Sequence, residues 1–281
     1  MRNLEKKLTT SGKGSTNIQT RRGKSFGYQV LGFGSGAAGL GPAISIVYDC
    51  IAGGGSGQAG PGWSGNEVTG GSGGGGFISN TSVDFYGGSE YVITVGAGGG
   101  SSRNKGANST IVGDGEVDIT ALGGGYGGDH YGQAGSSGGS GGGGGYAGGA
   151  GAGTADQGNA GSASCGSAPG KVAGGGGGKG GAGGCNGTKG TSGSGATSSI
   201  PTVSGTFSVG GEGNGPSHTN NANGGANTGD GANAEGNGGS GRIHLKILTS
   251  DYTGTTTGSP SVGTDGSYTI LQYTGNGTYT A

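Results

Sequence analysis

The sequence predicts a mainly β fold: a small antiparallel β framework that carries a glycine-rich region of irregular loops and packed polyglycine-II helices, with very little α-helix. Glycine accounts for 85 of the 281 residues, several-fold above the average of about 7%. Between residues 123 and 199, Val172 is the only Leu, Ile, Val or Phe, so this stretch cannot fold by burying its own side chains. The other apolar residues cluster before Ala121 and after Ile200, and no segment shows the sustained 3.6-residue period of a helix.

The first 24 residues are polar and basic, with at most a turn of helix at residues 3–8. They carry seven basic groups and one acid, although the whole chain has a net charge of −1. This asymmetry predicts an attachment arm, residues 1–24, that docks on an acidic neighbour or is simply solvated, rather than one that binds nucleic acid. The candidate attachment residues are Arg2, Lys6, Lys7, Arg21, Arg22 and Lys24.

A domain covering residues 25–248 follows, with its glycine-rich core at 123–240. Alternation or β-branched content predicts its strands, because strand side chains point to opposite faces in turn. In residues 241–248, Ile243, Leu245 and Ile247 face one way, whereas His244 and Lys246 face a solvated outer side. The strands are expected at residues 25–33, 43–52, 77–78, 83–86, 91–95, 110–112, 117–122, 206–209 and 241–248.

Residues 249–281 form a C-terminal segment that is predicted to be a β-hairpin. Strands are expected at residues 268–273 and 278–280, joined by a turn at residues 275–277.

The glycine runs can form an ordered structure without side-chain packing. Polyglycine can form an extended left-handed helix with three residues per turn, and such helices can lie side by side, joined by backbone hydrogen bonds. Ordering costs roughly 1–2 kcal/mol of backbone entropy per residue, so the array needs a rigid base. The flanking strands are the natural base.

Large side chains between the glycine runs are then expected in the turns. Loops rich in Tyr, Gly and Ser are typical of adaptable binding surfaces, because Tyr adds contact area at low entropic cost. Alternatively, the tyrosines only cover glycine backbone. The candidate receptor-binding residues are Trp63, Tyr126, Asp129, His130, Tyr131 and Tyr146.

The sequence contains no convincing motif for catalysis, for cofactor binding or for metal binding. Gly34-x-Gly36-x-x-Gly39 matches a dinucleotide fingerprint, but such matches are expected by chance at this glycine content, and Pro42 blocks the required helix. The three histidines lie in unlike contexts, no serine sits on a defined elbow, and no set of metal ligands converges. The sequence therefore predicts no enzyme, no catalytic residue, no metal and no cofactor.

The three cysteines, Cys50, Cys165 and Cys185, are odd in number and lack a C-x-x-C spacing. We expect free thiols unless the protein matures outside the cell; a Cys165–Cys185 bridge is the alternative. Residues 4–19 are polar, so no signal peptide is expected, and no apolar run approaches the roughly 20 residues of a membrane span.

Several phrases resemble the glycine-rich domain of tailed-phage tail fibres and other virion appendages. They are AISIVYDCIAGGGSGQ, GSEYVITVGAGGG, ITALGGGYGG and ANTGDGANAEGNGGSGRIHLKI, with residues 91–100 and 238–248 bracketing the glycine islands. The resemblance spans residues 26 to 281. The chain is also similar in style to the distal adhesins of T-even-type phages, in which packed polyglycine helices carry receptor-binding loops.

This resemblance implies a bacteriophage virion protein, made in the host cytoplasm. A tail-fibre or tail-tip adhesin would attach through residues 1–24 to the fibre shaft, tail or capsid and bind a host-surface glycan or outer-membrane protein. The alternative is a capsid decoration or head-fibre protein with a structural role. Fibre symmetry implies a homo-oligomer, expected to be a trimer. Neither nucleic-acid binding nor membrane insertion is expected.

Overall fold

The computed structural model describes residues 40–58, 68–100, 102–166, 170–215 and 220–281. Contacts divide the chain into two units, 1–41 and 42–281. The attachment arm with all six of its candidate residues, the strand expected at residues 25–33, the turn of helix at 3–8 and Trp63 lie outside the described residues. The predicted segment 249–281 belongs to the same unit as the preceding strands.

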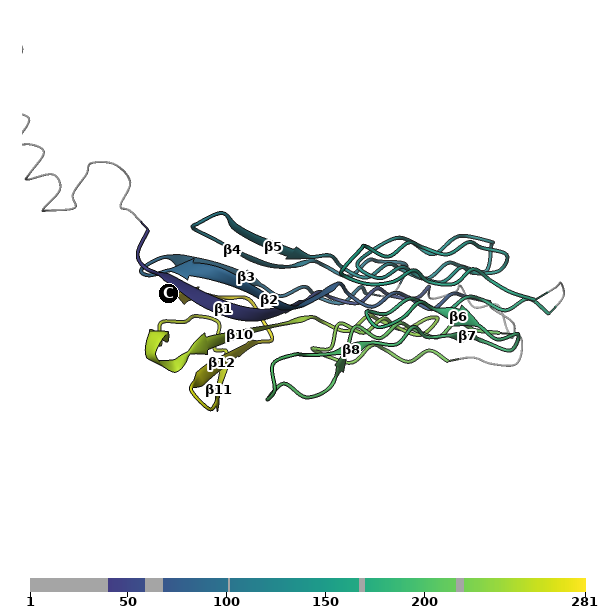
Figure 1. Cartoon of the computed structure of the whole chain (residues 1–281). Coiled ribbons are helices and arrows are strands. Elements are labelled where there is room, and N and C mark those ends of the chain that lie inside the picture. Colours follow the sequence, from purple (N-terminus) through teal and green to yellow (C-terminus); the bar gives the residue numbers. More distant parts are fainter. Residues whose placement is uncertain (1–39, 59–67, 101, 167–169, 216–219) are drawn as a thin grey trace, which may run out of the picture. The chain divides into compact units, whose positions relative to one another are not determined.

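The described fold is mainly β, as predicted, and its only helical element is the 3₁₀ turn η1 (Figure 1). One sheet has the strand order β11-β12-β10-β1-β2, a second has β13-β3-β4-β5, and two short pairs are β6-β7 and β8-β9, all antiparallel. The elements are β1 (Ala43–Ile51), β2 (Phe77–Tyr86), β3 (Glu90–Thr94), β4 (Ser109–Gly113), β5 (Val117–Ala121), β6 (Gly184–Cys185), β7 (Gly190–Thr191), β8 (Ala196–Thr197), β9 (Thr206–Phe207), β10 (Arg242–Leu248), η1 (Thr249–Asp251), β11 (Ser261–Asp265), β12 (Tyr268–Tyr273) and β13 (Gly277–Thr280).

The two larger sheets share one hydrophobic core. Their inward residues form a single buried cluster that includes Ile46 and Leu245 from the first sheet and Ile93 and Ile111 from the second. The rings of Phe85 and Tyr91 stack within it at 3.7 Å between centroids. Burial of these side chains supplies the rigid base that the glycine-rich region requires.

The two predicted C-terminal strands form, as β12 and β13, but they do not pair with each other; the hairpin of this segment is made by β12 and β11, a strand that was not predicted. β12 pairs with β10 and β11, whereas β13 pairs with β3 of the other sheet. The turn at residues 275–277 therefore passes the chain from one sheet to the other. The local sequence predicted these two strands correctly and their pairing wrongly, because pairing depends on partners far away in the sequence.

The outer face of β10 also differs from the prediction. Lys246 is partly exposed, but His244 is fully buried, because Phe207 of β9 covers it with the two rings 6.2 Å apart. Phe207 also packs edge-on against Phe77 at 5.8 Å. The short β8-β9 pair thus closes a second, smaller apolar cluster against the first sheet.

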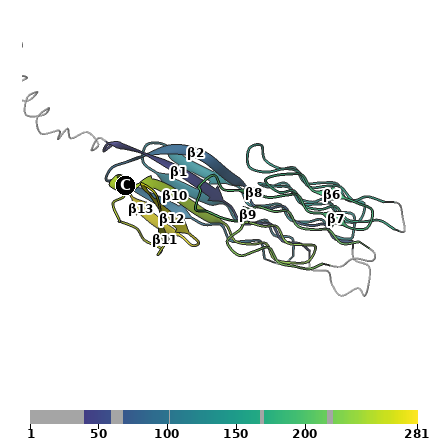
Figure 2. The same ribbon diagram turned by 60° about the horizontal axis from the view of Figure 1, so that its bottom comes forward.

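Between the strands, glycine-rich runs extend from the sheets and return to them (Figures 1 and 2). Run 70–76 shows how they are joined. The N–H groups of residues 70, 73 and 76 donate to run 122–128, those of 71 and 74 to run 174–177, and those of 72 and 75 to run 229–232. The acceptor run therefore recurs every third residue, which is the period of an extended three-residue helix.

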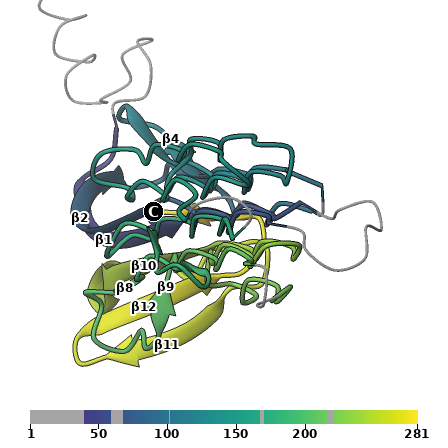
Figure 3. The ribbon, with the colours of Figure 1, turned by 90° about the vertical axis from the view of Figure 1, so that its right-hand side faces the viewer.

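Run 52–58 follows the same rule. The N–H groups of residues 52–57 donate in turn to runs 73–76, 104–107 and 236–239, and the carbonyls of residues 53–56 accept from runs 97–99, 124–127 and 230–232. Six neighbours surround it, in a lattice that Figure 3 views from the far end of the runs. The three-residue period agrees with the polyglycine-II prediction, although the helix type itself stays a prediction. Runs 52–58 and 70–76 lie before the predicted core 123–240, so the lattice begins earlier than expected.

Glycine is needed in the lattice because neighbouring backbones touch. A Cβ placed on Gly211 would lie 1.7 Å from the carbonyl oxygen of Ala232, far inside van der Waals contact. Serine also occurs in the runs: the fully buried Ser72 Oγ lies within hydrogen-bond distance of two carbonyl oxygens, those of Gly55 and Ala232, at 2.7 and 2.9 Å. The backbone groups of neighbouring runs are thus hydrogen-bonded to one another.

Candidate receptor-binding site

Four of the predicted receptor-binding residues meet where run 122–128 turns back at its far end. Tyr126 is in the run, and Asp129, His130 and Tyr131 form the turn that follows. Asp129 Oδ1 accepts the backbone N–H of Tyr131 at 3.0 Å, an Asx turn that suits the chain reversal. Gly132 completes the turn with φ 87°, a conformation that glycine adopts without steric cost.

Arg103, from the neighbouring turn between β3 and β4, joins these residues into one cluster. Its guanidinium carbon lies 4.8 Å from the centre of the Tyr126 ring, and its Nη1 lies 3.4 Å from Asp129 Oδ2. Arg103 and the preceding Ser102 have φ values of 63° and 81°. Such φ values are uncommon for residues other than glycine and cluster at functional sites. The Arg103 N–H donates to Gly57 O at 3.1 Å, which fixes the turn on the lattice.

Two features of this cluster suit a ligand. The Tyr131 side chain is 74% exposed, and its ring lies 3.8 Å from that of His130, so it offers an aromatic surface to solvent. Among the described residues, Arg103 Nε and His130 Nδ1 are buried polar atoms without a hydrogen-bond partner. Buried groups of this kind are costly unless a partner satisfies them. We name Arg103, Tyr126, Asp129, His130 and Tyr131 the tip cluster.

The other two predicted residues are not part of the tip cluster. Tyr146 lies in the next turn, where its N–H donates to Val68 O at 3.0 Å and the Lys171 ammonium lies 5.1 Å from its ring centre. Trp63 lies outside the described residues. Sequence reasoning missed Arg103, and the only signal for it was a basic residue within a short polar insert between two predicted strands.

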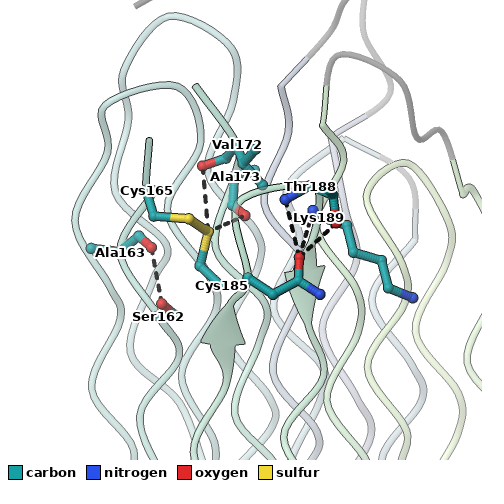
Figure 4. Close-up of a disulfide and its surroundings, with 9 residues drawn as sticks. Ser162, Ala163, Cys165, Val172, Ala173, Cys185, Thr188 and Lys189 are labelled. Carbon is teal, nitrogen blue, oxygen red and sulfur yellow. Dashed lines mark hydrogen bonds between the residues drawn. A yellow bond between two sulfur atoms is a disulfide. The ribbon is translucent and has the colours of Figure 1, made fainter. Parts of the chain in front are cut away.

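A disulfide joins Cys165 and Cys185, so the expectation of free thiols is wrong for these two residues. Their Cα atoms lie 6.1 Å apart, a usual separation for a bridge. The reason is topological: the chain pairs Cys165 with Val172, and Cys185 Sγ lies 3.9 and 3.7 Å from the carbonyl oxygens of Val172 and Ala173 (Figure 4). Cys50 remains a free, buried thiol, and burial raises its pKa to about 12.

A second polar cluster lies inside the fold, where β1, β2 and β10 meet the β8-β9 region. Asp49 and His244 are both fully buried, with 3.3 Å between Asp49 Oδ2 and His244 Nδ1. Ser79 and Ser198 donate their hydroxyls to the Asp49 carboxylate. Because both serines bond to the carboxylate and the imidazole is sealed from solvent, this cluster is a structural tie rather than a hydrolase triad.

Comparisons with protein-family models, with curated proteins and with solved structures found no match. The tip cluster is therefore interpreted from its own contacts. In the part of the chain that the structure describes, no group of three or more metal-ligating side chains gathers, and no helix is long and apolar enough to cross a membrane.

Proposed function

We propose that this chain is a bacteriophage virion protein, a tail-fibre or tail-tip adhesin that binds a host-surface receptor through the tip cluster. One observation carries the proposal. Four residues that the sequence predicts to bind a receptor lie together with Arg103 at turns of a hydrogen-bonded lattice. The resemblance of residues 26 to 281 to virion appendages supports the same class.

The lattice suits such a role because it holds the turns on runs whose backbone groups bond on several sides. Binding then requires little further ordering of the chain, and pre-organisation of this kind lowers the entropic cost of association. Tyr131 offers ring area to a sugar or an aliphatic side chain, and Asp129 with Arg103 offers a hydrogen-bond acceptor beside donors. A host-surface glycan or an outer-membrane protein would use both.

The test measures adsorption of virions that carry Tyr131→Ala together with Arg103→Ala. We expect adsorption to the host to fall at least tenfold with unchanged incorporation of the chain, because Tyr131 is exposed and Arg103 lies in a turn. The matched control is Tyr268→Ala, which removes a 40% exposed tyrosine from β12; its adsorption should equal that of the wild type. Equal adsorption by the double variant would refute the proposal.

Locating the chain in a virion reconstruction separates the two structural classes. Density at the tail tip or fibre end supports the adhesin. Density on the capsid, combined with normal adsorption of the double variant, would favour the decoration or head-fibre alternative.

A further inference from the structure

A polar groove in the glycine-rich region is lined by none of the residues of the tip cluster. It opens between runs 209–212 and 230–233 and the adjoining residues 220–225, and its volume is about 380 Å³, within the range of roughly 300–1,000 Å³ usual for small-molecule sites. We name it the side groove. The side chains that line it are nearly all polar: Ser192, Glu212, Asn220, Asn223, Asp230 and Asn233.

Two of its amides are held in one orientation. Asn233 Oδ1 accepts the backbone N–H of Glu212, and Asn223 Oδ1 accepts that of Asn237, both at 2.8 Å. A backbone N–H can only donate, so each contact identifies the amide oxygen. The NH₂ group of each amide then lies on the other side of the side chain and remains a donor in the lining of the groove.

Two carboxylates supply the acceptors. Asp230 Oδ1 accepts the backbone N–H of Val209 at 2.9 Å, which anchors this carboxylate on the lattice. Glu212 pairs with Lys189 and accepts the amide of Asn220 at 3.0 Å. Each carboxylate oxygen has two lone pairs, so anchored carboxylates can accept further hydrogen bonds from a ligand.

The lining excludes two classes of ligand. Val209 is the only aliphatic side chain larger than a methyl group in the lining, so an apolar ligand would gain little from burial. The lining contains two carboxylates, those of Glu212 and Asp230, so an anionic ligand would meet like charge. A neutral ligand that both donates and accepts hydrogen bonds fits what remains.

We propose that the side groove binds a neutral saccharide. A sugar hydroxyl can donate to the carboxylate of Asp230 while a neighbouring hydroxyl accepts from the amide of Asn233 or Asn223, and hydrogen bonds to charged groups are the stronger ones. Because the lining offers no aromatic ring, a single site binds weakly, with Kd on the order of 1 mM. Repetition of the groove in an oligomer would raise the overall affinity.

The test follows the backbone amide signals of the ¹⁵N-labelled full chain during titration with methyl glycosides of glucose, galactose, mannose and N-acetylglucosamine. We expect one or more of these probes to shift the signals of Gly210 and Gly231 saturably. Asn233→Asp and Asn223→Asp keep the pinned oxygen and remove the NH₂ donors, so each should raise Kd at least fivefold.

Asn276→Asp is the matched control. Asn276 Oδ1 also accepts a backbone N–H, that of Val95 at 2.9 Å, but Asn276 does not line the groove; this variant should bind like the wild type. Absence of saturable shifts with all four probes, or wild-type Kd values in both groove variants, would overturn the proposal. The Tyr131→Ala and Arg103→Ala double variant should keep groove binding, so this result and the adsorption result can fail independently.

Discussion

Replacing Gly54 by alanine tests whether backbone contact in the lattice fixes the glycine content. A Cβ on Gly54 would lie 1.9 Å from the carbonyl oxygen of Asp230 and 2.4 Å from its carbon, whereas ordinary contact begins near 3.4 Å. Runs 52–58 and 229–232 would therefore have to separate by about 1.5 Å. Gly54 N–H donates to Gly239 O and Gly54 O accepts from Gly99 N–H, each at 2.9 Å, in two other runs. Moving Gly54 away from Asp230 by this amount therefore displaces it from both partners, and hydrogen bonds weaken steeply when their geometry is lost.

The cost follows from these bonds. If two buried backbone bonds are lost at about 1–3 kcal/mol each, the free energy of unfolding falls by about 2–6 kcal/mol. We expect about 4 kcal/mol from urea unfolding of the full chain followed by circular dichroism. The matched control is Gly100→Ala, because nothing lies within 4 Å of a Cβ there; it should change stability by less than about 1 kcal/mol. A loss below about 1 kcal/mol for Gly54→Ala would refute the packing argument.

Three further predictions concern the Asp49–His244 pair, the Cys50 thiol and the disulfide. Asp49→Ala removes the buried acceptor of the Ser79 and Ser198 hydroxyls and the carboxylate beside His244. It should lower the free energy of unfolding by about 3–5 kcal/mol in urea titrations; a loss no larger than that of the partly exposed Asp265→Ala would contradict the buried tie. Cys50 should not react with a thiol reagent in the native chain at pH 8 and should react after unfolding, because burial stabilises its neutral form; for the same reason stability should fall as the pH rises from 9.0 towards about 12. Replacing Cys165 and Cys185 by serine should cost about 3 kcal/mol, measured by thermal unfolding, because their separation is 20 residues; an unchanged melting temperature would argue against the bridge.

The strands could be predicted from the sequence because their signal is local. Residues 43–52 are the most hydrophobic run of the chain and include β-branched Ile and Val residues, and β1 occupies Ala43–Ile51. A strand was predicted at residues 268–273, and β12 has the same bounds. The pairing of β13 with β3 could not be predicted, because Tyr279 and Tyr91 are opposite each other across a long sequence separation.

The burial of a side chain by a residue distant in the sequence could not be predicted either. His244 lies on the side of β10 that the alternation predicts to be solvated, and it is buried there by Phe207, a residue distant in the sequence. Arg103 carried no motif, and its place beside Tyr126 depends on two runs being neighbours in the lattice. The residues of runs 52–58 and 70–76 read as loop by composition, because a lattice run and a flexible glycine loop share the same residue types.

The three-residue recurrence of partners also governs how such a chain can change in length. Adding one residue inside run 70–76 would turn every following N–H towards the wrong neighbour, because the acceptor alternates among three runs. Adding residues in the turn at 129–132 disturbs no such sequence of partners. Insertions and deletions of any number of residues should therefore accumulate in the turns, whereas the runs should change in length only by multiples of three residues.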